Sequence, residues 1–153
     1  MNDFDFLVGT WDVVNRRLRK RLVGSDDWDV FPGHATHHFR AFDGGVNVDE
    51  ITFPTLGYSG LSVRLYDPGT GLWSIQWAAS APPVRLEPPV FGRFTDGVGE
   101  FEGDDTHEGT PIRVRFRWDG ITDTTARWTQ AFSTDGGSTW ETNWTMDFTR
   151  TGR

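Results

Sequence analysis

The stretch IRVRFRWDG, residues 112–120, decides the fold class of this chain. Its apolar side chains alternate with arginines, so they share one face of an extended strand: Ile112, Val114, Phe116 and Trp118. Asp119-Gly120 follows directly and tolerates the positive φ that a tight hairpin turn requires. A strand with one apolar and one charged face, ending in such a turn, indicates an antiparallel sheet that buries one side.

The same two-residue period recurs on both sides of this stretch, with turn residues between the repeats. It predicts about ten strands and an all-β fold, with room for a short helical turn at residues 3–8. The expected strands are residues 9–22, 28–42, 46–53, 58–67, 72–79, 90–95, 98–106, 112–119, 125–133 and 139–150. The sequence leaves open which face of the second to fourth strands points inward.

Length and composition indicate one domain over residues 1–153 and limit its partners. The 8 Trp and 12 Phe favour strands around a well-filled interior. A net charge of −7 argues against nucleic-acid binding, and the absence of cysteine excludes disulfides and thiolate chemistry. Because no signal-like or membrane-spanning apolar run is present, we expect a cytoplasmic protein with no membrane partner. A homodimer is left open.

The N-terminal stretch Phe6-Leu7-Val8-Gly9-Thr10-Trp11 is similar to the Gly-x-Trp signature of the calycins, which include the lipocalins and fatty-acid-binding proteins. In that group the Trp closes one end of the barrel under an Arg from the last strand, and Arg150 is the matching residue here. The resemblance implies a closed antiparallel up-and-down barrel of about ten strands. It also implies structural closure by Gly9, Trp11 and Arg150, where Gly9 allows a close approach of the chain.

The whole chain also resembles a bacterial lipocalin-like family of unknown function. The resemblance rests on the N-terminal stretch, residues 139–144 and three shorter phrases: Asn47-Val48-Asp49-Glu50, Leu65-Tyr66-Asp67-Pro68 and Gly103-Asp104-Asp105. It implies a fold but no activity. The chain lacks the helix pair and the Arg-x-Tyr clamp of the fatty-acid-binding proteins, so a fatty-acid ligand is not implied.

Residues 133–140 resemble the Asp-box hairpin of sialidase propellers. In such a turn Asp135 accepts hydrogen bonds from backbone N–H groups while Trp140 covers the loop. One copy cannot build a propeller, so we expect a structural role.

The aromatic faces carry the main functional hypothesis, a barrel that binds a small organic molecule that is apolar or aromatic. Polar side chains share these faces, as Asn15 and Arg17 do after Trp11, and they would be costly in a dry core. Apolar walls with a few polar groups are typical of ligand pockets. The expected ligand-binding residues are Asn15, Trp77, Trp128, Gln130 and Trp144. A barrel filled by its own side chains, acting through its outer surface, remains a further possibility.

The alternative is a cofactor-independent enzyme, an isomerase, cyclase or lyase, with His38 and Glu50 as candidate catalytic residues. The turn at residues 43–45 would bring their strands together, and histidine suits proton transfer near neutral pH. An ordinary cross-strand ion pair explains the same residues. No cofactor is expected, and no metal site, because no segment has the spacing of metal ligands.

The basic run at residues 16–21 precedes Asp26, Asp27 and Asp29 on the returning strand. We therefore expect cross-strand charge pairing to account for it without a bound partner.

Overall fold

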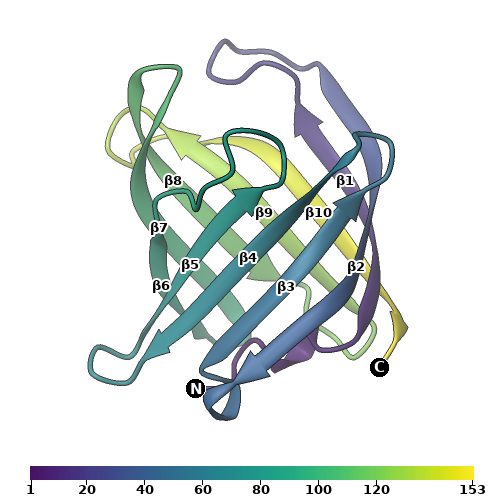
Figure 1. Cartoon of the computed structure of the whole chain (residues 1–153). Coiled ribbons are helices and arrows are strands. Elements are labelled where there is room, and N and C mark those ends of the chain that lie inside the picture. Colours follow the sequence, from purple (N-terminus) through teal and green to yellow (C-terminus); the bar gives the residue numbers. More distant parts are fainter.

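In the computed structural model, which describes residues 1–153, ten antiparallel strands close into one barrel (Figure 1). Each strand pairs with the next along the chain and β1 pairs with β10, so the sheet has no free edge. The predicted all-β fold and closed up-and-down barrel are therefore confirmed. The strands are β1 (Thr10–Leu18), β2 (Trp28–Ala41), β3 (Val46–Phe53), β4 (Tyr58–Asp67), β5 (Leu72–Ala79), β6 (Val90–Thr95), β7 (Val98–His107), β8 (Thr110–Asp119), β9 (Thr125–Ser133) and β10 (Glu141–Gly152).

The largest differences from the predicted boundaries are in the first and last strands. β1 ends at Leu18, because the chain then leaves the sheet in a loop where Leu22 and Gly24 have positive φ. β10 begins at Glu141, because Trp140 belongs to the preceding turn. The expected helical turn near the N-terminus is the 3-10 helix η1 (Asp5–Leu7), and a second one, η2 (Phe42–Gly44), joins β2 to β3. Neither is long or apolar enough to span a membrane.

The N-terminal segment closes one end of the barrel, at the bottom of Figure 1. The Trp11 indole N–H donates to the Leu7 carbonyl at 3.0 Å, and the Arg150 guanidinium lies 4.2 Å from the Trp11 ring centre. Arg150 also donates to the carbonyls of Phe6 and Val8, at 2.8 and 2.6 Å. The predicted contact between Arg150 and Trp11 is confirmed, and it fixes the segment across the barrel base.

Gly9 allows this closure because a side chain would not fit at its position. Its φ is +115°, and a Cβ there would lie 2.5 Å from the Gly152 carbonyl oxygen and 2.6 Å from Arg150 Nη1. Only glycine combines this backbone conformation with so close an approach of the C-terminal strand.

The hairpin between β9 and β10 has the structural role expected of its motif. Asp135 Oδ1 accepts from the Thr139 amide at 2.9 Å, and the Trp140 indole donates to the Gly137 carbonyl at 3.0 Å. Hydrogen bonds from the Thr139 side chain and backbone lower the pKa of Asp135 far below its usual range. The turn is therefore held by its own residues.

The opposite end of the barrel, at the top of Figure 1, is formed by loops. Two long connections lie there, residues 19–27 between β1 and β2 and residues 80–89 between β5 and β6. Because the N-terminal segment blocks the base, this mouth is the end through which the interior can be reached.

Candidate ligand-binding cavity

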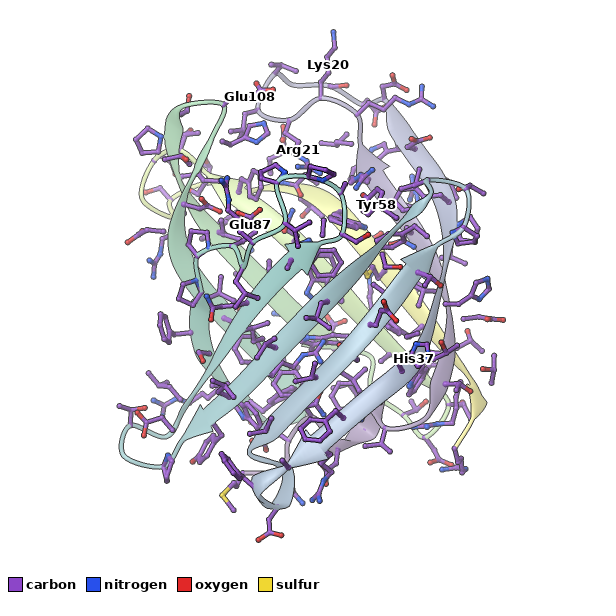
Figure 2. All side chains as sticks on the ribbon, in the orientation of Figure 1. Lys20, Arg21, His37, Tyr58, Glu87 and Glu108 are labelled. Atoms are coloured by element: carbon purple, nitrogen blue, oxygen red, sulfur yellow. The ribbon has the colours of Figure 1, made fainter.

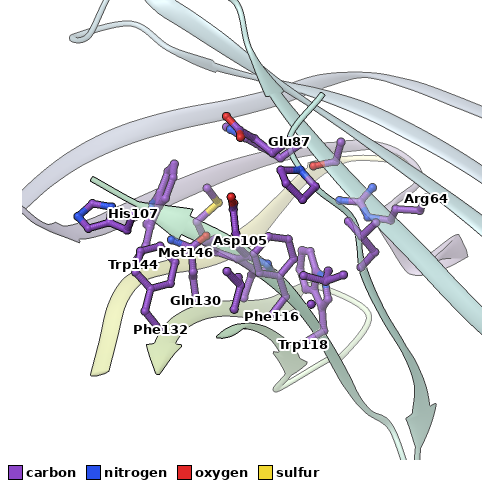
Figure 3. A pocket seen from close by; sticks show the side chains of 18 of the residues that line it. Arg64, Glu87, Asp105, His107, Phe116, Trp118, Gln130, Phe132, Trp144 and Met146 are labelled. Atoms are coloured by element: carbon purple, nitrogen blue, oxygen red, sulfur yellow. The ribbon is translucent and has the colours of Figure 1, made fainter. Parts of the chain in front are cut away.

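A cavity of about 280 Å³ lies inside the barrel between the closed base and the mouth (Figure 3). Half of its 24 lining residues are hydrophobic, so it combines apolar walls with polar groups. Figure 3 shows Arg64 at one side of the cavity and His107 at the other. The three tryptophans predicted to bind a ligand, and Gln130, are among the lining residues.

The three tryptophans form one wall around Trp144. Its ring centre lies 5.8 Å from that of Trp77 and 5.5 Å from that of Trp128, both in edge-to-face geometry. Trp77 packs against the backbone at Gly60, where a Cβ would come within 1.9 Å of its ring. The strands therefore leave room for the indole at this place only because residue 60 has no side chain.

The two predicted polar ligand-binding residues differ in position. Gln130 lines the cavity but also donates to Asn143 Oδ1 at 2.8 Å, so part of its hydrogen-bonding capacity is used by the protein. Asn15 is fully buried outside the cavity lining, and its Oδ1 accepts from the Trp144 indole N–H at 3.1 Å. Asn15 thus orients Trp144 from behind the wall.

A buried ion pair forms the inner end of the cavity. Arg64, only 3% exposed, donates from Nη1 to Asp49 Oδ1 at 2.8 Å and to Asn47 Oδ1 at 2.9 Å. Asn47 in turn donates to the Phe4 carbonyl at 3.1 Å, which links the pair to the N-terminal segment. Arg64 and Asp49 both line the cavity, and Arg64 Nε has no partner. The inner end is therefore polar, with its charges balanced.

The mouth of the cavity carries most of its titratable groups. Arg21 comes from the β1–β2 loop, Glu87 from the β5–β6 connection, and Asp105 and His107 from the end of β7. Figure 2 shows Arg21, Glu87 and Tyr58 gathered near this end of the barrel. The expectation of cross-strand pairing for the basic run is met in Arg19, which lies 3.3 Å from Asp27 and 3.2 Å from Asp29.

His38 and Glu50 do not form a pair. In the register that runs from the turn between β2 and β3, Glu50 lies opposite His37 and accepts its hydrogen bond at 2.9 Å on the exposed outer face. His38 lies opposite Asp49 with its Nε2 buried and unpartnered, and burial lowers the pKa of its imidazole. Neither His38 nor Glu50 lines the cavity, which is a correction to the pairing considered from the sequence.

The sequence did not predict the polar ends of the cavity. The inner face of β4 was left open by the sequence; in the structure Leu61 and Leu65 are 39% and 44% exposed, and Arg64 points inward. No local signal could have revealed this orientation. Asp105 and His107 were detectable, because they share their alternation with buried Phe101.

No group of His, Asp or Glu side chains is arranged to hold a metal ion. No model of a known protein family matches the chain, and no curated protein is significantly similar to it. The fold and the cavity together define a class, a closed ten-stranded antiparallel barrel consistent with a calycin-like fold.

Proposed function

We propose that this barrel binds a small, largely apolar or aromatic organic molecule in its cavity. The observation that carries the proposal is the meeting of three tryptophan rings at one partly enclosed space of about 280 Å³. Ligand pockets typically begin near 300 Å³, with apolar walls and a few polar groups. The size suits a molecule of one or two rings.

The polar groups of the cavity would orient such a ligand. Gln130 stands between Trp128 and Phe132 on the inner face of β9, and its Oε1 makes no hydrogen bond within the protein. The motif around Trp11 supports membership of the bacterial lipocalin-like family, which we propose for this chain. We also propose a cytoplasmic location. A barrel filled by its own side chains would leave no such cavity. The separation of His38 from Glu50 removes this pair as the catalytic residues of the enzymatic alternative.

The test uses N-phenyl-naphthylamine, a neutral two-ring probe whose fluorescence rises in apolar surroundings. The probe should bind the wild-type protein, quench its tryptophan fluorescence and raise its melting temperature, because a ligand specific to the folded state stabilises that state. Trp77→Ala should weaken binding at least about twofold, since an aromatic contact contributes roughly 0.5–1.5 kcal/mol.

Trp140→Ala is the matched control, because Trp140 stacks with Arg115 at 4.2 Å in the hairpin and does not line the cavity. It should leave probe affinity unchanged. No probe binding to the folded wild-type protein, or equal losses in the two variants, would show that the cavity is not a binding site.

A further inference from the structure

Two arginines at the mouth of the cavity have no carboxylate partner. Arg17 and Arg21 take part in none of the ion pairs of the protein. Other arginines of the chain, such as Arg16 and Arg115, also lack an ion-pair partner, so these two are distinguished by their position at the mouth of the cavity.

Arg17 is held in place by stacking. Its guanidinium lies 4.9 Å from the Phe31 ring centre and 4.8 Å from that of Trp144, and Nη1 donates to the Tyr58 hydroxyl at 3.0 Å. No other side-chain hydrogen bond from Arg17 is formed. Packing on aromatic rings fixes a guanidinium plane while leaving its N–H edge free, which suits recognition of an oxyanion.

Arg21 lies close to Arg17 on the same side of the mouth. Its guanidinium is 5.7 Å from the Phe132 ring centre, and its Nε is buried without a hydrogen-bond partner. Burial, and then the positive charge of Arg17, lower the pKa of Arg21, while Tyr58, Glu141 and Glu108 act in the opposite direction. The two cations therefore repel each other, and an anion between them would remove that repulsion.

Both arginines line a second, outer pocket that adjoins the cavity. Arg21 and His107 line the two spaces, so they mark the place where one opens to the other. The outer pocket also contains Lys20, which has no ion-pair partner, and its acids are Asp29, already paired with Arg19, and the highly exposed Glu108. The balance of charge in this pocket is positive.

We propose that Arg17 and Arg21 form an oxyanion subsite at the mouth, so that the ligand is an aromatic molecule carrying a carboxylate, sulfonate or phosphate group. This rests on the proposed function, because the rings of that molecule would occupy the tryptophan-lined cavity. The stacked guanidinium of Arg17 would donate to the oxyanion, and Arg21 would cover it from the β1–β2 loop.

The experiment compares two probes that differ in one group, anilinonaphthalene sulfonate and the neutral N-phenyl-naphthylamine. Arg17→Gln should weaken binding of the sulfonate about tenfold or more, since charge-assisted hydrogen bonds are lost, and should change binding of the neutral probe less than about twofold. Arg21→Gln should act in the same direction, which provides a second variant if Arg17→Gln does not fold. Added salt should weaken binding of the sulfonate alone.

Arg16→Gln is the matched control, because Arg16 is the neighbour of Arg17 on the outer face of β1 and stacks on Trp28. It removes the same charge and should change neither affinity. Inorganic phosphate is the third ligand. If phosphate displaces the sulfonate probe only at millimolar concentration, the result supports an anion that is part of the aromatic molecule. Tight binding of phosphate by itself would show instead that the subsite binds a free anion.

The outcomes separate the two proposals. Unchanged sulfonate affinity in both variants, or equal losses for the two probes, would overturn the subsite and leave the cavity as a neutral binding site. If neither probe binds the wild-type protein, the proposed function fails and the subsite fails with it.

Discussion

Replacement of Asp49 with alanine should destabilise the folded protein by about 3–5 kcal/mol, because it leaves a buried arginine without its carboxylate. The Arg64 side chain is 4% exposed and that of Asp49 11%, so Arg64 would remain largely removed from bulk solvent after its partner is lost. Arg64 Nε already lacks a hydrogen-bond partner, and only Asn47 would remain to accept from Nη1. The charge would then be held by one neutral acceptor and by packing near the rings of Phe4 and Trp118.

Urea unfolding followed by tryptophan fluorescence measures this loss. At about 2–4 °C per kcal/mol for a domain of this size, the melting temperature should fall by roughly 6–20 °C. Glu100→Ala is the control, because it breaks an ion pair of similar length, 3.1 Å to Arg117, in which the Glu100 side chain is 48% exposed. That exposed pair should contribute less than about 1 kcal/mol.

A double variant separates the unpaired charge from the lost volume. Asp49→Leu combined with Arg64→Met removes both charges, and replacement of a buried pair by apolar side chains is often close to neutral. The double variant should therefore be more stable than Asp49→Ala. If Asp49→Ala costs no more than Glu100→Ala, the inner end of the cavity is hydrated and the description of a dry, charge-balanced pair is wrong.

Two further predictions concern residues singled out from the sequence. Gln130→Leu should cost about 1–3 kcal/mol in urea unfolding, because buried Asn143 Oδ1 loses its donor; an unchanged midpoint would mean that Gln130 serves the ligand alone. Burial lowers the pKa of His38 below its usual 6.5, so the unfolded state binds more protons below that pH. Stability should fall as pH drops through 6.5 and level off below the folded-state pKa. His38→Gln should flatten this decline relative to His37→Gln, and an identical pH profile in the two variants would contradict it.

The barrel could be predicted from the sequence because the signals that mark its strands and turns lie within short stretches of the chain. Alternation and Asp-Gly or Gly-rich turns mark each strand, and β3, β4, β5, β6 and β9 begin and end at the predicted residues. Closure followed from one non-local pair, Trp11 and Arg150, which lie opposite each other in β1 and β10. The tryptophan wall followed from the same alternation, since Trp77, Trp128 and Trp144 lie on faces whose apolar side is evident.

The polar half of the cavity could not be predicted, for two physical reasons. In β4 the outer face is as apolar as the inner one, so hydropathy does not show that Arg64 points inward. In β2 and β3 the partner of Glu50 is set by the register of the hairpin, which places His37 opposite Glu50 and turns His38 to the other face. Both features depend on neighbouring strands, which the pattern within one strand does not describe.

The arginines at the two ends of the cavity differ in their ion pairing, and this difference sets the orientation of the proposed ligand. At the inner end Arg64 is neutralised by Asp49, so a second carboxylate there would lie close to a buried anion. At the mouth Arg17 and Arg21 take part in no ion pair, and their mutual repulsion favours an added anion. A molecule with both an aromatic and an anionic part therefore gains most when its rings enter first, toward Trp144 and the inner end. Its oxyanion then stays at the mouth, where it can exchange contacts with water during entry and release.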